Sequence, residues 1–187
     1  MPSTLGYALL GLLARKPRTG YELTQALREP IGYFWTASHS QVYPELARLE
    51  ARGWTRYEII EGPGPRDTKR YAITAAGRRA LGTWAVAPAR PERSRNELLL
   101  KVYSLWLADP AAARSLIIAE REQHSAMLAR YEKLAAQSER GDPADLAAPQ
   151  FFDYATLCRG LSFERHVLAW CDWLVAALER RTGPAAP

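Results

Sequence analysis

Two side chains between residues 38 and 54 have the geometry to read base pairs. Arg48 carries a planar guanidinium that can donate two parallel hydrogen bonds to guanine, and Gln41 carries an amide that can pair with adenine. Ser40 and Tyr43 add hydroxyl groups that can bind bases or phosphates. The alternative for each is a solvated polar side chain on an ordinary surface helix. We predict DNA contacts from this stretch at Ser38, Ser40, Gln41, Tyr43 and Arg48.

These side chains need a rigid element to present them, and the sequence predicts a helix. Val42, Leu46 and Leu49 recur at i, i+4 and i+7, which places an apolar stripe on one side. Pro44 is tolerable only if it lies in the first turn, and Gly53 supplies a left-handed stop. The side opposite the stripe is predicted to carry Gln41, Tyr43, Glu45, Arg48 and Arg52.

Two β-rich runs follow this helix. Residues 54–60 and 68–73 contain many β-branched and aromatic side chains, and residues 61–67, with two glycines and two prolines, separate them. This pattern predicts a hairpin with a stiff tip that carries Arg66. Helix, turn, helix and a two-stranded wing together form a winged helix-turn-helix. The candidates for minor-groove or phosphate contact in this wing are Arg66, Lys69 and Arg70.

The N-terminal residues predict two supporting helices. The first begins after Ser3 or Thr4 and ends at Pro17, and the second begins after Thr19. Glu22 lies three residues after Thr19, which is the spacing of a capping box. Free amides at a helix N-terminus can also bind phosphate, although a capping box needs no DNA. The candidates for contact with the DNA backbone are Thr19, Gly20 and Tyr21.

The second half of the chain predicts a separate helical domain. Residues 87–94 have the composition of a linker, and three helical patterns follow at 95–107, 110–140 and 151–181. The predicted fold is therefore mainly α, with an N-terminal winged helix-turn-helix and a C-terminal three-helix dimerisation domain. The predicted limits are 1–86 for the DNA-binding domain, 95–182 for the helical domain and 183–187 for a disordered tail.

The third helical pattern is apolar over so wide an arc that it needs neighbours on both flanks. One neighbour would come from its own chain and another from a second chain, which predicts a homodimer. The alternative is that one monomer covers both flanks. The residues predicted to mediate dimerisation are Leu157, Leu161, Val167, Leu168, Trp170, Leu174, Val175 and Leu178.

Three tryptophans of the helical domain could line a pocket for a small aromatic or hydrophobic effector. They are Trp106, Trp170 and Trp173. The alternative for each is an ordinary core tryptophan.

Composition and charge favour a polyanionic partner. The 187 residues carry a net charge of +5. All of the excess lies in residues 1–86, with 12 Lys and Arg against 7 Asp and Glu, whereas residues 87–187 hold 13 of each. A basic region joined to a neutral one is typical of a protein in which one domain binds nucleic acid and the other has a different function.

Other classes of protein are not indicated. The three histidines lie in different segments without metal-ligand spacing, and no nucleophile elbow, phosphate-binding loop or dinucleotide motif is present. We therefore expect no catalytic activity, metal or cofactor. The sequence shows no signal peptide and no membrane-spanning run, so we expect a cytoplasmic protein with two free thiols, Cys158 and Cys171.

Four motifs in order resemble the PadR family of transcriptional regulators. They occupy residues 5–13, 19–23, 41–46 and 69–77, with a Tyr-Pro-Glu-Leu motif between a Thr-Gly-Tyr-Glu motif and a wing that ends in Tyr-Ala-Ile-Thr. The second half is similar to the longer, virulence-activator type of PadR C-terminal domain, in which three helices mediate dimerisation.

This resemblance implies a homodimer that binds a pseudo-palindromic DNA operator. Such proteins are usually repressors, and some members release DNA in response to a small molecule or a stress signal. Two recognition helices would enter successive major grooves about 34 Å apart. The alternative function is a winged-helix adaptor that binds other proteins without reading DNA, which would leave the positive charge of the first half unexplained.

Overall fold

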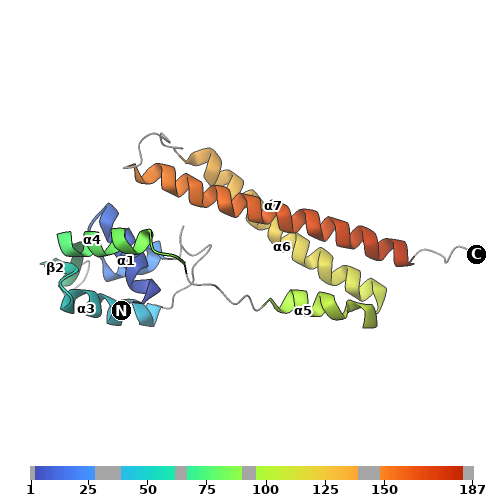
Figure 1. Cartoon of the computed structure of the whole chain (residues 1–187), viewed down its shortest axis with the longest axis horizontal. Helices are drawn as coiled ribbons and strands as arrows, with labels where there is room; N and C mark the ends of the chain where they lie inside the picture. The colour runs from blue at the N-terminus through green and yellow to red at the C-terminus, as the bar shows by residue number, and fades with distance from the viewer. Residues whose placement is uncertain (1–2, 28–38, 62–66, 90–95, 139–147, 183–187) are drawn as a thin grey trace, which may run out of the picture. The chain divides into compact units, whose positions relative to one another are not determined.

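The computed structural model describes residues 3–27, 39–61, 67–89, 96–138 and 148–182. The chain divides into two compact units, Met1–Pro91 and Glu92–Pro187 (Figure 1). The first is called the winged-helix unit and the second the helical unit. Their boundary lies within the predicted linker, and the predicted domain limits stay a prediction. The predicted tail lies outside the described residues.

Along the chain of the winged-helix unit, short strands alternate with helices. In chain order its described elements are α1 (Thr4–Arg15), β1 (Arg18–Thr19), α2 (Gly20–Ala26), α3 (His39–Ala51), β2 (Thr55–Ile60), β3 (Thr68–Ile73) and α4 (Ala75–Ala85). The strands form one antiparallel sheet in the order β1-β3-β2. The sheet therefore has one strand more than the predicted wing, because Arg18 and Thr19 pair with Tyr71 and Arg70 of the middle strand.

Side-chain caps determine where these helices begin. Ser3 Oγ accepts a hydrogen bond from the Gly6 amide at the start of α1. Thr19 and Glu22 form the predicted capping box, in which each backbone amide donates to the other side chain. The hydrogen bond from the Thr19 backbone is the main reason that the pKa of Glu22 lies below its ordinary value. The predicted start of α2 is confirmed.

Gly53 ends α3 in the left-handed conformation that the sequence predicts, with a φ of 66°. The Gly53 amide donates to the Glu50 carbonyl at 2.8 Å, and the Trp54 amide donates to the Leu49 carbonyl at 3.0 Å. These two hydrogen bonds form a Schellman motif. The chain therefore turns sharply from α3 into the wing.

The expectation for Pro44 is wrong. Helix α3 begins at His39, so Pro44 lies beyond its first turn. The proline ring removes one amide that would otherwise donate to the carbonyl of Ser40. The helix nevertheless continues through Pro44 to Ala51.

The core of the winged-helix unit is formed by apolar side chains of the first three helices and the middle strand. Its buried members are Leu5, Leu9, Leu10, Leu12, Leu13, Leu23, Leu27, Val42, Leu46, Leu49 and Tyr71. Because α3 contributes three of them, one side of that helix is fixed to the core.

Gly77 lets the start of α4 approach the backbone of Trp54, which lies between α3 and β2, closely. A Cβ atom at this position would lie 2.2 Å from the Trp54 carbonyl oxygen. That oxygen also accepts a hydrogen bond from the Thr74 amide at 3.0 Å, so it cannot move aside freely. Only glycine fits here.

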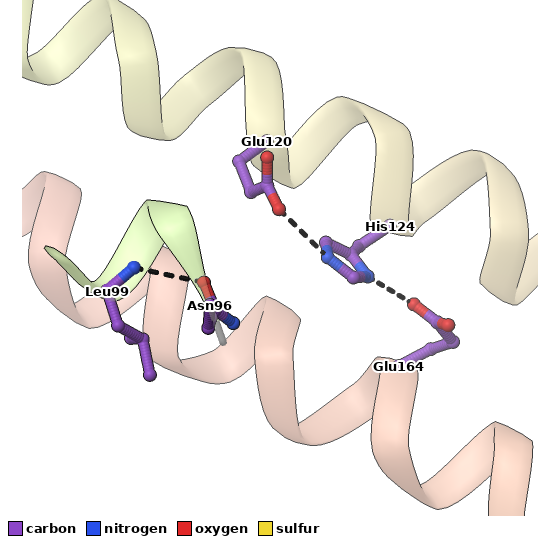
Figure 2. Close-up of polar contacts among 5 residues, drawn as sticks. All are labelled: Asn96, Leu99, Glu120, His124 and Glu164. Atoms are coloured by element: carbon purple, nitrogen blue, oxygen red, sulfur yellow. Dashed lines mark hydrogen bonds and ion pairs between the residues drawn. The ribbon is translucent and has the colours of Figure 1, made fainter. Parts of the chain in front are cut away.

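The helical unit contains the three predicted helices. They are α5 (Glu97–Ser104), which continues into the 3₁₀ turn η2 (Leu105–Leu107), α6 (Pro110–Gln137) and α7 (Pro149–Thr182). Asp109 caps α6 with Pro110 directly after it, and the Asn96 side chain accepts a hydrogen bond from the Leu99 amide at the start of α5 (Figure 2).

Helices α6 and α7 lie side by side and run antiparallel (Figure 1). Arg114 near the start of α6 pairs with Glu179 near the end of α7, and Glu132 near the end of α6 pairs with Arg165. Helices α6 and α7 share a core formed by Ala113, Ile117, Cys171 and Leu178.

Both cysteines are free thiols on α7, and burial raises the pKa of Cys171. Among the described helices, none has the length and apolar character needed to cross a membrane.

Candidate nucleic-acid interface

Helix α3 buries its apolar side and turns a polar side to solvent. Val42, Leu46 and Leu49 are at most 1% exposed, which confirms the predicted stripe. The predicted contact residues that lie on the outer side are exposed: Ser40, Gln41, Tyr43 and Arg48.

The prediction that Glu45 lies on this outer side is wrong. It is only 2% exposed. Its Oε1 accepts a hydrogen bond from the Ser3 amide at 3.3 Å, and its Oε2 accepts one from Arg48 Nη1 at 2.9 Å. Burial alone would raise the pKa of this carboxyl, but the hydrogen bonds from Ser3 and Arg48 outweigh it, and the pKa lies below the ordinary 4.5. Glu45 is therefore a buried, charged residue of α3.

The start of α2 lies against the outer side of α3. A Cβ atom at Gly20 would lie 2.6 Å from Cε1 of Tyr43, so the tyrosine ring covers this glycine. Tyr21 is 63% exposed, whereas Thr19 is half-buried and its hydroxyl is used in the capping box. The structure thus places Gly20 against Tyr43, and Gly20 itself is buried.

Lys69 and Arg70 lie on opposite faces of β3, because neighbouring strand residues alternate. Lys69 Nζ lies 3.6 Å from the centre of the Tyr57 ring, and a hydrogen bond with Tyr57 raises the pKa of the lysine. Arg70 is paired in the sheet with Glu58 on one side and Thr19 on the other. Arg70 therefore lies beside the start of α2, and the two cations belong to different faces of the wing.

Sequence reasoning missed the burial of Glu45 and the strand β1. Glu45 follows Val42 by three residues and precedes Leu49 by four, so its spacing fits the apolar stripe and could have predicted burial. Strand β1 has two residues, which is too short for an alternating pattern. Two predicted contact residues, Ser38 and Arg66, lie outside the described residues.

Comparison with known proteins identifies the family. The model of the PadR-like family of transcriptional regulators matches residues 9–83, and that of the virulence activator alpha C-terminal domain matches residues 94–179. The negative transcriptional regulator PadR of Bacillus subtilis (strain 168) is 30% identical over 181 residues, which cover 94% of this chain and 98% of the relative. The chain belongs to the PadR-like family of transcriptional regulators.

Solved structures extend this similarity to the fold. The crystal structure of Bacillus subtilis PadR in complex with operator DNA has a TM-score of 0.83 at 27% identity and covers 94% of this chain and 99% of that one. The structure of the same protein in complex with p-coumaric acid has a TM-score of 0.79 at 28% identity, with coverages of 95% and 99%. The predictions of family and of a mainly α, winged-helix fold are confirmed.

The helical unit of this PadR-like regulator uses much of the predicted dimer surface internally. Leu161 and Leu178 are 8% and 6% exposed in the single chain, so they leave little surface for a partner. Leu157 and Leu168 are half-buried. The remaining predicted residues pack partly against the core of the same unit: Val167, Trp170, Leu174 and Val175.

The tryptophans predicted to bind an effector have different environments. Trp106 of η2 and Trp173 of α7 are 68% and 60% exposed, so in the single chain neither is a core residue. Trp170 packs partly against the core formed by α6 and α7. Effector binding at these residues stays a prediction.

A histidine joins α6 to α7 inside the helical unit. Figure 2 shows the His124 ring between the carboxylates of Glu164 and Glu120. Its Nδ1 lies 2.5 Å from Glu164 Oε2, and its Nε2 lies 3.3 Å from Glu120 Oε1. The two carboxylates meet opposite nitrogens, so they do not converge on one point as metal ligands would. Within the described parts of the chain, no group of three acidic, histidine or cysteine residues could hold a metal ion.

Proposed function

We propose that this PadR-like regulator is a homodimer that binds a pseudo-palindromic DNA operator and represses transcription. The observation that carries the proposal is the outer side of α3, where Ser40, Gln41 and Arg48 are exposed while the opposite side is fixed in the core. Such a helix fits the major groove, and Lys69 and Arg70 of the wing can contact the adjacent backbone. The proposed regulator works in the cytoplasm and is not an enzyme.

The relatives support both parts of this proposal. The similar Bacillus subtilis protein is a negative regulator, and its structure contains operator DNA. A second structure of that protein contains p-coumaric acid, which supports relief of repression by a small aromatic molecule in this chain as well.

DNA binding is tested by selecting bound fragments from the source genome and measuring affinity for the selected duplex and for a scrambled duplex. We expect the affinity to fall steeply with salt, by about 0.9 logarithmic units per phosphate contact for each tenfold rise in salt. Binding without salt dependence, or without preference for the selected duplex, would favour the protein-interaction adaptor.

Two substitutions separate base reading from phosphate binding. Arg48→Ala should reduce the preference for the selected duplex by about 5- to 150-fold, because a bidentate contact to a base is lost. Lys69→Ala should weaken binding to both duplexes alike. Arg165→Ala in the helical unit removes the same charge from a surface distant in sequence and serves as the control. Equal loss on both duplexes for Arg48→Ala would remove this residue from the base-reading set.

The homodimer requires an apolar surface, and α5 with η2 provides one. Leu98, Val102 and Leu105 pack against the core of their own unit. The opposite side of this segment bears large apolar side chains that are more than half exposed: Leu99, Leu100, Tyr103, Trp106 and Leu107. A contiguous exposed apolar patch of this kind is typical of an interface.

Chain mass in solution tests this assignment. We expect a dimer for the wild type and a shift toward monomer for Leu100→Lys. Leu157→Lys on α7 is the matched substitution at a position from the sequence-based prediction, and it should leave the dimer intact. Dissociation by Leu157→Lys alone would return the interface to α7, and a monomeric wild type would exclude the homodimer.

A further inference from the structure

Glu45 occupies an unusual position for an acidic residue of a helix that faces DNA. It lies within the apolar stripe between Val42 and Leu49, and its side chain is 3% exposed. A carboxylate in such a site is costly unless hydrogen bonds and opposite charge stabilise it. Both of its oxygens are satisfied, one by a backbone amide and the other by Arg48.

The backbone contact anchors this carboxylate to the rigid part of the unit. The Ser3 amide that donates to Glu45 belongs to the residue that caps α1. Helix α1 supplies five of the buried core leucines, so Ser3 caps a helix that is itself packed into the core. The Glu45 carboxylate is therefore a fixed point beneath the outer side of α3.

The Arg48 side chain contacts this buried carboxylate and extends into solvent. Its side chain is 70% exposed, yet its Nη1 lies 2.9 Å from Glu45 Oε2. A free arginine side chain loses about 2 kcal/mol of rotamer entropy when it is immobilised, so prior anchoring lowers the cost of binding. The contact with Glu45 uses one of five N–H groups, and the hydrogens on Nε and Nη2 can still form a bidentate pair with guanine.

We propose that Glu45 is a positioning residue, which holds the Arg48 guanidinium in the orientation that reads a base pair. This inference rests on the proposed DNA-binding function and deepens it by naming what determines specificity at that contact. Glu45 does not touch DNA itself. It acts through Arg48, and Ser3 fixes its place.

A double-mutant cycle tests the coupling between these two residues. The wild type, Glu45→Gln, Arg48→Ala and the double variant are each measured on the selected and on the scrambled duplex, as full-length protein. Glutamine keeps an acceptor for Ser3 but removes the charge that holds the arginine. We expect Glu45→Gln to lower the preference for the selected duplex by about tenfold. The double variant should show no less preference than Arg48→Ala alone, because the glutamate has nothing left to position.

Loss of a negative charge near DNA needs its own control. Glu50→Gln removes the same charge from the same helix, and Glu50 lies outside the Ser3 and Arg48 contacts of Glu45. This variant should bind both duplexes slightly more tightly and keep the wild-type preference, because removing a negative charge favours any polyanion.

Several outcomes would overturn the proposal. Equal losses on both duplexes for Glu45→Gln, or effects that add to those of Arg48→Ala, would show that Glu45 only supports the fold. A gain in preference would show that Glu45 withholds Arg48 from DNA. Thermal melting of each variant separates unfolding from altered binding. A wild type that shows no preference between duplexes would instead contradict the proposed function itself.

Discussion

Each unit buries one glutamate, and the two carboxylates are held in different ways. In the described residues, Glu45 and Glu164 are the charged side chains that are buried, at 2% and 6% exposure. Glu45 is joined to a backbone amide and to an arginine that extends into solvent. Glu164 is joined to His124 of the neighbouring helix, which also contacts Glu120 (Figure 2). Glu45 therefore connects the core to the exposed side of α3, whereas Glu164 connects two helices to each other.

The two units also differ in what surrounds a closely packed glycine. In the winged-helix unit, a Cβ atom added at Gly77 would meet a backbone oxygen of Trp54. In the helical unit, a Cβ atom added at Gly160 would meet the edge of the Tyr131 ring. Backbone fixed by hydrogen bonds cannot yield, but a side chain can rotate. Similar substitutions in the two units should therefore have unequal effects.

The largest effect is expected from Gly77→Ala. The added methyl group would overlap the Trp54 carbonyl, so we expect the free energy of unfolding to fall by more than about 3 kcal/mol. Urea unfolding followed by circular dichroism measures this loss. Gly82→Ala is the matched control, because Gly82 lies in the same helix with no atom within 4 Å of the added group. It should stabilise the protein by up to about 1 kcal/mol through helix propensity. Similar results for both variants would contradict the packing argument.

His124→Ala should have the next largest effect. It leaves the buried Glu164 carboxylate without its partner on α6, and we expect a loss of about 2 to 3 kcal/mol in the stability of the helical unit. Arg165→Ala removes an exposed ion pair between the same helices and should cost less than about 1 kcal/mol. Chemical unfolding of the two variants decides the comparison, and equal losses would mean that the histidine is no more important than a surface charge.

Glu45→Gln should have a smaller effect, and that effect should depend on pH. Near neutral pH we expect a loss of about 1 to 2 kcal/mol, because charge-assisted hydrogen bonds are weakened. The pKa of Glu45 in the folded protein lies below 4.5, so its ionised form stabilises the fold above that pH and loses this contribution as the pH falls further. Stability measured from pH 6 to pH 3 should show the wild type and the variant converging in acid. A difference that stays constant with pH would exclude ionisation of Glu45 as its source.

The smallest effect is expected from Gly160→Ala. The new methyl group would lie 3.0 Å from the buried Tyr131 ring, and a shift of the ring by a few tenths of an ångström would relieve the contact. The gain in helix propensity of about 1 kcal/mol opposes this strain, so the net change in stability should stay within about 1 kcal/mol. A shift in melting temperature as large as that of Gly77→Ala would remove the distinction between the two units.

Local signals account for what could be predicted. The Thr19 cap and the Gly53 stop both depend on residues within a few positions of each other, and the structure contains both of them. The spacing of Glu45 fits the apolar stripe, but its hydrogen-bond donor Ser3 could not be predicted, because Ser3 is 42 positions away in the chain. The pairing of β1 with β3 could not be predicted either, because the two strands lie far apart in the chain.

The sequence by itself determined the order of helices, the wing, the apolar side of α3 and the family, because periodicity, caps and turn residues act over short distances along the chain. Tertiary structure alone decided which groups hold the buried Glu45 carboxylate, which face of the wing each cation occupies, and that α5 with η2 exposes more large apolar side chains than α7. Those properties depend on which segments meet in space. An amphipathic pattern shows that a side chain needs cover, but only packing shows what covers it.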